Sequence, residues 1–253
     1  MIKFFRKIRY DLLEKNKTGK YLKYAIGEIA LVVIGILIAL QINNYNIQKQ
    51  NEKIEQIYLL ALQNEFKNNI KLLDSTISHN KKVIKGTVKL LSFFDSKVFD
   101  TLSQKTVSLN MAKATAEETY FNPSTGVLTE IISSGNLKLF KNQELKQKLA
   151  SFGNTLEMLK HQEKEVLRHG HNIEELRASG GNIGKMFSDT GSSFEWKSRF
   201  AKASNLDLFK SKLFENRLFL FLGSSSGTDF YFYQPMKKEI KSILKIIENE
   251  IKD

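Results

Sequence analysis

The chain has 253 residues, of which 42% are hydrophobic, and a formal net charge of +12. It contains no cysteine, which excludes disulfides, thiolate nucleophiles and thiolate metal ligands, and its two prolines leave room for long helices. The basic excess also suits nucleic-acid binding, but no recognition-helix pattern and no interleaving of basic and aromatic residues supports that alternative.

Residues 1–20 are predicted to form a basic cytoplasmic segment beside a membrane. Within the first 24 residues, eight lysines and arginines are opposed only by Asp11 and Glu14. Basic residues near a bilayer surface attract anionic headgroups by roughly 1 kcal/mol each. The residues expected to contact lipid headgroups are Lys3, Arg6, Lys7, Arg9, Lys20 and Lys23.

Residues 21–42 are predicted to form a single transmembrane helix. Ile29–Leu40 is an unbroken apolar run, and about 22 helical residues span a hydrocarbon core about 30 Å thick. A cleaved signal peptide is the alternative, but residues 39–41 lack the small-x-small pattern that signal peptidase needs, so an uncleaved signal anchor is favoured. The basic tail predicts a cytoplasmic N-terminus and a periplasmic C-terminal part at the inner membrane.

Four residues inside the span are candidates for helix packing within the membrane. Gly27, Gly35 and Ala39 share one helix face, and small residues there let two backbones approach, which favours self-association. Glu28 is costly in lipid when ionised. Two interpretations of Glu28 stay open: a proton, ion or polar-contact site, or a carboxyl that is protonated or reaches the interface near Lys23.

The opening MIKFFRKIR and the segment KYLKYAIGEIALVVIGILIALQINNYN resemble the start of a family from Bacteroidota-type bacteria whose members contain a domain of unknown function. Ile131–Leu139 followed by Asn142–Leu145 resembles a second recurring segment of that family. Tyr45 stands where the family is expected to have tryptophan. The resemblance implies an inner-membrane protein with a helical periplasmic part, and it implies no reaction.

Residues 43–253 are predicted to form a helical periplasmic domain that begins with a long, stalk-like helix over about 46–95. Apolar residues repeat there every seven positions on two neighbouring tracks, and Asn80 and Thr87 interrupt the second track. Packing inside a bundle is therefore favoured over a dedicated coiled coil. The first track is Ile70, Ile77, Ile84 and Leu91, and the second is Leu59, Phe66 and Leu73.

The middle of the chain is predicted to form two short helices followed by a second long helix. A short helix is expected within 97–121, and Ser124 is expected to cap a brief helix that Gly135 closes. A second long helix is predicted to end near Ala178, and the Gly- and Ser-rich residues 179–203 are expected to be a loop. The second long stripe is Leu145, Phe152, Leu159, Val166 and Ile173, with Leu149 and Leu156 beside it.

Ser204 with Asp207 resembles a capping box and predicts another helix start. Residues 218–233 are expected to be either helical or a hairpin, and Pro235 suits the first turn of a final helix. Together the elements predict an all-α fold, in which the transmembrane helix continues into an antiparallel bundle. The expected apolar faces are Leu206, Phe209, Leu213 and Leu220, and then Met236, Ile240, Ile243, Ile247 and Ile251.

His161, Glu165 and His169 are the side chains whose spacing suits a metal ion. They lie nearly opposite the apolar stripe of their helix, on the face expected to be solvated. No nucleophile, phosphate-binding or dinucleotide motif occurs. We therefore predict no catalytic residue, no cofactor and no metal site, with these three residues as weak metal candidates.

The leading hypothesis is a non-enzymatic, membrane-anchored periplasmic protein that acts as an interaction, scaffold or accessory subunit. Its expected partners are the lipid bilayer and either a second copy or a larger membrane complex, with no nucleic acid. A small-molecule-sensing module is the alternative, and it would signal through a partner because about 20 cytoplasmic residues cannot form a kinase or cyclase. A hydrolase or metal enzyme built around His161 ranks last.

Overall fold

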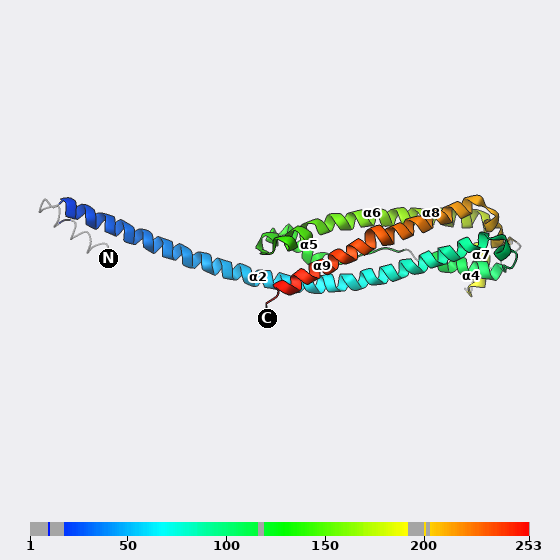
Figure 1. The fold of residues 1–253 in the computed structure, drawn as a ribbon, viewed down its shortest axis with the longest axis horizontal. Helices are drawn as coiled ribbons and strands as arrows, with labels where there is room; N and C mark the ends of the chain where they lie inside the picture. The colour runs from blue at the N-terminus through cyan, green and yellow to red at the C-terminus, as the bar shows by residue number, and fades with distance from the viewer. Residues whose placement is uncertain (1–9, 11–17, 116–118, 192–199, 201–202, 253) are drawn as a thin grey trace. The chain divides into compact units, whose positions relative to one another are not determined.

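The computed structural model describes residues 10, 18–115, 119–191, 200 and 203–252 (Figure 1). The chain divides into two compact units, Met1–Ile57 and Tyr58–Asp253. Over the described residues the structure is helical and contains no strand, which confirms the predicted all-α class.

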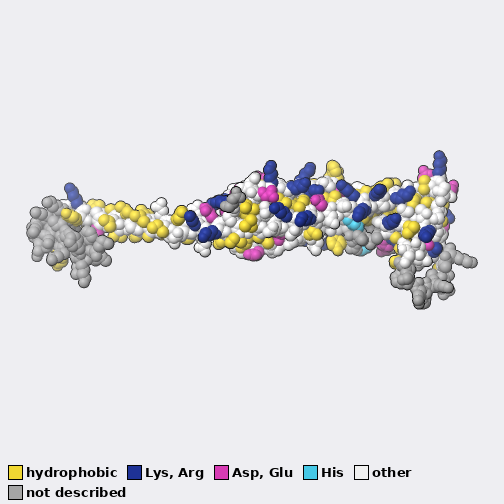
Figure 2. Space-filling view, turned by 90° about the horizontal axis from the view of Figure 1, so that it is seen from below, with side chains coloured by type: hydrophobic (Ala, Val, Ile, Leu, Met, Phe, Trp, Pro, Cys, Tyr) yellow, Lys and Arg dark blue, Asp and Glu magenta, His cyan; other side chains and the backbone are white. Residues whose placement is uncertain are grey.

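Helix α2, Thr18–Leu91, is 74 residues long. Its N-terminal part is apolar and long enough to cross a membrane, by length and composition, and none of that apolar window is buried within the structure. No other helix in the described ranges meets both criteria. Figure 2 shows hydrophobic side chains around this segment, whereas lysine, arginine, aspartate and glutamate are spread over the helical unit. Exposed apolar surface of this extent is typical of segments that contact a membrane or another protein.

Short helices and two further long ones follow α2. The π-helix η4 joins α8 to α9 without a break, so that Lys212–Glu250 forms one continuous helical segment. The elements are η1 Ser92–Phe94, α3 Ser96–Phe99, α4 Gln104–Thr115, α5 Gly126–Ser133, η2 Asn136–Leu139, α6 Gln143–Gly180, α7 Ile183–Asp189, η3 Asn205–Lys210, α8 Lys212–Thr228, η4 Asp229–Tyr233 and α9 Gln234–Glu250.

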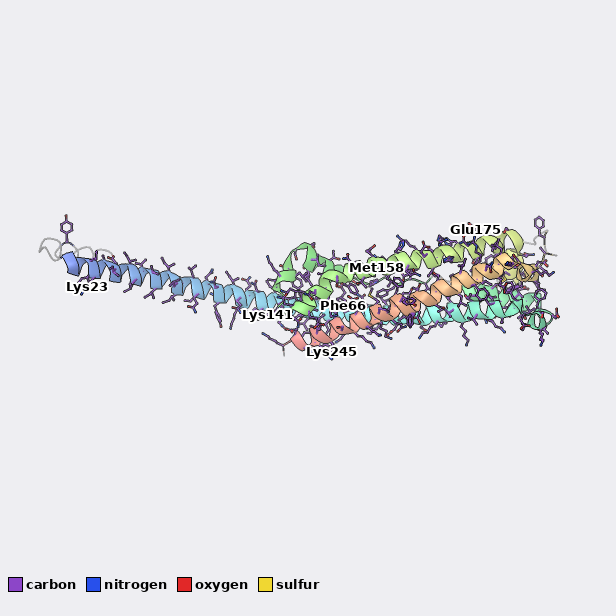
Figure 3. All side chains as sticks on the ribbon, turned by 45° about the horizontal axis from the view of Figure 1, so that its top comes forward. Lys23, Phe66, Lys141, Met158, Glu175 and Lys245 are labelled. Carbon is purple, nitrogen blue, oxygen red and sulfur yellow. The ribbon has the colours of Figure 1, made fainter. Side chains whose placement is uncertain are left out.

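Three long helical segments pack along one another in the second unit. The rings of Phe66 on α2 and Phe152 on α6 are 5.1 Å apart, and further along the same two helices Val83 and Val166 share a core cluster. These two helices therefore run in the same direction. The α8–α9 segment runs antiparallel to α6, because Gln162 contacts Thr228 whereas Asn142, twenty residues earlier, contacts Glu250. Figure 3 labels Phe66 on α2 and Met158 on α6, and the Met158 side chain is 66% exposed.

The heptad tracks account for the core. The α6 stripe is buried at every predicted position. On α2 the second track is the more buried, since Leu59, Phe66 and Leu73 are inaccessible and Asn80 and Thr87 continue them into the interior. The first track lies at the edge of the core, where only Ile77 is buried.

Helix α5 begins one residue later than predicted and is capped from another helix. Thr125, rather than Ser124, is its N-cap and makes no capping bond. The Glu65 carboxylate of α2 accepts hydrogen bonds from the backbone N–H groups of Val127 (2.8 Å) and Leu128 (3.2 Å) instead. Gly135 ends this region as expected, with a left-handed φ of 70° that glycine adopts without steric cost.

Three expectations about the C-terminal half need correction. The predicted loop 179–203 contains a helix, α7, which Asn182 caps by accepting from Lys185 N–H at 2.8 Å; residues 192–199 and 201–202 lie outside the description. The expected single helix within 97–121 is two helices, α3 and α4. Leu213 and Leu220 are about half exposed, because Phe214, Leu218 and Phe221 form the buried face of α8.

The predicted last helix is confirmed, and Met236, Ile240, Ile243 and Ile247 are buried along α9. Ile251, also expected on this face, is the extended C-cap residue after the helix and is half-buried. Residues 218–233 are helical, so the hairpin alternative is wrong. Ser204 caps the 3-10 helix η3 by accepting from Leu206 N–H, and Ser211 caps α8 by accepting from Phe214 N–H.

Candidate functional site

A cavity of about 680 Å³ opens in the second unit between α2, α6, α8 and residues 119–122. Its wall is mainly apolar and also contains polar side chains, among them Asn80, Glu163 and Ser225 from three different helices. Further polar residues of the wall are Thr119, Asn122, His171 and Glu174. Basic side chains of α6 also line it. The apolar part of the wall comprises Val83, Ala114, Phe121, Val166, Leu167 and Phe221.

Glu163 is the buried carboxyl group of this cavity, with 7% of its surface exposed. Its Oε1 atom accepts hydrogen bonds from the Phe121 backbone N–H at 2.7 Å and from the Tyr233 hydroxyl at 2.9 Å. Burial raises the pKa of Glu163 above its ordinary value, and these two bonds and the charge of Lys160 oppose the rise. Burial likewise raises the pKa of Tyr233, reinforced by the Glu163 charge.

The π-helix η4 places Tyr233 against Glu163. Buried residues of α8 and α9 are spaced by three or four positions, except for one step of five between Thr228 and Tyr233. A π turn absorbs one extra residue within a helix, so both α8 and α9 keep their buried faces toward the core. Pro235, which has no N–H to donate, follows directly, where the α-helical bonding pattern is already altered.

Hydrogen bonds beside Glu163 connect α8 with α2 and with α6. Asn80 is buried and donates from Nδ2 to the Ser225 carbonyl at 3.0 Å. Ser225 is 1% exposed, and its hydroxyl has no hydrogen-bond partner among the described residues. Gln162 donates to the Thr228 hydroxyl at 3.1 Å. Buried polar groups are normally paired, so the Ser225 hydroxyl is an exception that calls for an explanation.

The structure does not bring the predicted metal candidates into a site. His161 is exposed and His169 is half-buried on α6, and Glu165 accepts two hydrogen bonds from Arg168, at 2.6 and 3.0 Å. The Arg168 hydrogen bond lowers the pKa of Glu165, and burial lowers the pKa of His169. In the described part of the chain, no three His, Cys, Asp or Glu side chains are grouped as a metal ion requires.

The residues predicted to act in a membrane belong to α2 or precede it. A Cβ atom added at Gly27 or Gly35 would meet nothing within 4 Å, Ala39 is exposed and Glu28 is half-buried. Lys23 is exposed, and Lys20 lies in α2 with its side chain outside the description. Helix packing and headgroup contact by these residues stay predictions. Lys3, Arg6, Lys7 and Arg9 lie outside the described residues.

The cavity residues Asn80, Glu163 and Ser225 are not among the sites predicted from the sequence. A signal was present on α6, because Glu163 follows Leu159 by four positions and precedes Val166 by three, which is the register of the buried stripe. A charged residue at a core position is rarely accidental, since burial of an unpaired carboxylate is costly. Asn80, which interrupts the second apolar track of α2, carries the same signal.

Comparison with known proteins gives a family and no activity. The model of a family of unknown function, DUF6090, matches residues 28–174, which is more than half of the chain. The match includes the N-terminal apolar segment from Glu28 onward and most of α6. No curated protein and no solved structure matches the chain significantly.

Proposed function

Given that the chain belongs to this family of unknown function, DUF6090, we propose that it is a non-enzymatic, membrane-anchored helical protein that acts as an interaction or accessory subunit of a membrane complex. The observation that carries this proposal is the exposed apolar segment of α2, none of whose apolar window is buried within the structure. Such a surface is stable in lipid and unfavourable in water.

The proposed topology is a cytoplasmic N-terminus and a periplasmic helical unit at the inner membrane. It is supported by the basic residues before the apolar segment, because cytoplasmic flanks of transmembrane helices are enriched in lysine and arginine. The first 57 residues form a compact unit separate from Tyr58–Asp253, as expected of an anchor and the domain that it carries.

The absence of cysteine makes this topology directly testable. A Met158→Cys variant presents a thiol at a position that is 66% exposed on α6, and a Lys15→Cys variant presents one in the basic tail. With a membrane-impermeant maleimide, Met158→Cys should be labelled in spheroplasts and Lys15→Cys only after lysis. The reverse labelling, or a mature chain that begins near Gln41, would overturn the proposed anchor and topology.

Self-association through the small-residue face of α2 is the proposed basis of assembly. Side chains this small let two helices approach, so a large side chain should separate them. Gly35→Leu should abolish crosslinked dimers in the membrane, whereas Ile36→Leu, its neighbour on another face, should preserve them. Unchanged crosslinking in Gly35→Leu would remove this interface, and recovery of the full chain as a monomer without partners would contradict the interaction role.

Small-molecule sensing is the second candidate function, and the cavity between α2, α6 and α8 favours it. Ligand sites in helical proteins are typically clefts of 300–1,000 Å³ with mainly apolar walls and a few polar groups. The 680 Å³ cavity lies within this range. A sensor of this kind would transmit its signal through a partner.

A further inference from the structure

Two polar atoms in the cavity wall have hydrogen-bonding capacity that the protein does not use. Both hydrogen bonds to Glu163 end on Oε1, which leaves its Oε2 without one from any described residue. The Ser225 hydroxyl likewise has no partner in the described part of the chain. Both residues line the same cavity, one from α6 and the other from α8. The wall thus contains an acceptor and a serine whose hydroxyl is able to donate, although that hydroxyl oxygen is itself covered in the ligand-free structure.

The other residues of the wall restrict the polarity and the charge of the ligand. Phe121, Val166 and Phe221 provide apolar surface that favours an aromatic or aliphatic body. Lys160 and Lys164 line the cavity together with Glu163 and Glu174, so the wall carries charges of both signs and favours neither a cation nor an anion. A carboxylate ligand seated deep in the cavity would meet the carboxyl of Glu163. The wall therefore selects a neutral polar group.

We propose that this cavity binds a neutral, mainly apolar molecule that carries a hydroxyl group. The hydroxyl donates to Glu163 Oε2 and accepts from the Ser225 hydroxyl, because one hydroxyl provides both a donor and an acceptor. The apolar body packs against Phe121, Val166 and Phe221. This site deepens the second candidate function, sensing, and does not depend on the membrane anchor.

The first test compares three naphthalene probes that share an apolar body. The full chain in lipid nanodiscs is dialysed against 1-naphthol, naphthalene or 1-naphthylmethylammonium, with empty nanodiscs as the blank. We expect saturable binding of 1-naphthol at one molecule per chain, at least about tenfold tighter than either analogue, because unpaired buried polar groups are costly. Equal binding of 1-naphthol and naphthalene, or tighter binding of the ammonium probe, would overturn the proposal.

The second test uses variants that change the cavity and leave the fold intact. A side chain at Gly170 enters the cavity, and its Cβ would meet Phe221 Cε2 at an ordinary 3.6 Å. Gly170→Leu should abolish 1-naphthol binding, whereas Gly153→Leu should preserve it, because Gly153 lies on the exposed face of the same helix with nothing within 4 Å. Circular dichroism should show both variants folded. Equal binding by both variants would contradict the assignment.

Ser225→Ala separates recognition of the hydroxyl from simple filling of an apolar hole. The variant should weaken 1-naphthol binding severalfold and leave naphthalene binding unchanged, since it removes a hydroxyl that makes no hydrogen bond within the described structure. An equal effect on both probes would overturn the hydroxyl assignment. Saturable binding of 1-naphthol that leaves partner crosslinking unaltered would overturn sensing as a function while supporting the site itself.

Discussion

At the scale of single residues, Glu163 makes the stability of the helical unit depend on pH. Burial is the main cause that raises its pKa above the ordinary value of 4.5. The folded state therefore binds the Glu163 proton more tightly than the unfolded state does. The resulting stabilisation is complete below the unfolded pKa and is lost as the pH rises through the higher folded pKa.

A Glu163→Gln variant should therefore lose part of this pH dependence. Glutamine stays neutral and keeps an oxygen to accept from Phe121 N–H and the Tyr233 hydroxyl. We expect the fall in unfolding free energy between pH 4.5 and pH 7 to be shallower than in the parent chain, as measured by urea unfolding. Glu175→Gln, at an exposed position of the same helix, serves as the control, and equal slopes in all three proteins would contradict the prediction.

Glu65 offers a second prediction at this scale. Its carboxylate accepts from the first-turn N–H groups of α5, at Val127 and Leu128, and from the Ser124 hydroxyl at 3.3 Å. Glu65→Ala leaves these donors without their acceptor, which should lower the unfolding free energy by about 1–3 kcal/mol. Glu65→Gln keeps one acceptor oxygen and should cost less. If urea unfolding gave the same midpoint for both variants and for the parent chain, capping by this carboxylate would be unimportant.

These residues show what a local sequence pattern, the heptad register, can and cannot predict. The heptad register marks Glu163 and Asn80 as core positions from sequence alone, so their burial was predictable in principle. Their partners were not, because Phe121 and Tyr233 are 42 and 70 residues away from Glu163. A periodicity describes one helix face, whereas a hydrogen bond between helices depends on which faces meet.

At the scale of elements, the π-helix η4 is the feature with the clearest mechanical role. The step of five from Thr228 to Tyr233 contains one residue more than an α-helix needs to keep both faces buried. Deletion of Phe230, which is 70% exposed, should convert η4 to an α-helix and preserve the core. The free energy of unfolding should change by less than about 1 kcal/mol, because surface changes usually have small effects.

Deletion of Lys238 provides the matched control. This residue is also exposed, but its removal rotates the following residues by about 100°. Ile240, Ile243 and Ile247 would leave the core, at a cost of roughly 2 kcal/mol or more for each isoleucine. We expect this variant to be unfolded by circular dichroism. Equal destabilisation by the two deletions would show that η4 does not act as a register adjustment.

Elements with strong periodicity were predictable, and elements defined by composition were not. The stripes of α6 and α9 predicted their buried faces, because each long helix buries a repeated apolar pattern. Helix α7 was not predicted, because its glycine- and serine-rich surroundings resemble a linker. Its start depends on the Asn182 cap. The exposed Leu213 and Leu220 show that apolar residues alone do not identify a buried face when phenylalanines lie beside them.

At the scale of the whole molecule, the direction of α6 is the result that sequence patterns leave open. Short loops would have placed successive long helices antiparallel. Here the chain between α2 and α6 forms α3, α4 and α5 and returns to the beginning of the unit, so that α6 runs parallel to the corresponding part of α2. Heptads predict that helices pack, but the length and path of a connection decide their relative direction.

Membrane anchoring itself is testable by placing charge on α2. Ile34 and Leu37 are more than half exposed in the apolar segment and contact no core. A lysine at the centre of a transmembrane helix costs about 2.5–3.5 kcal/mol on insertion scales, so the double variant Ile34→Lys with Leu37→Lys should fail to remain in the membrane pellet after an alkaline wash.

The control substitution is Leu72→Lys, at another exposed position of the same helix within the second unit. It should stay in the pellet, because its side chain lies outside the apolar segment. Circular dichroism should show the helical unit folded in both proteins, since none of the three side chains belongs to the core. If the double variant pelleted as completely as the parent chain, the apolar segment of α2 would not be the anchor.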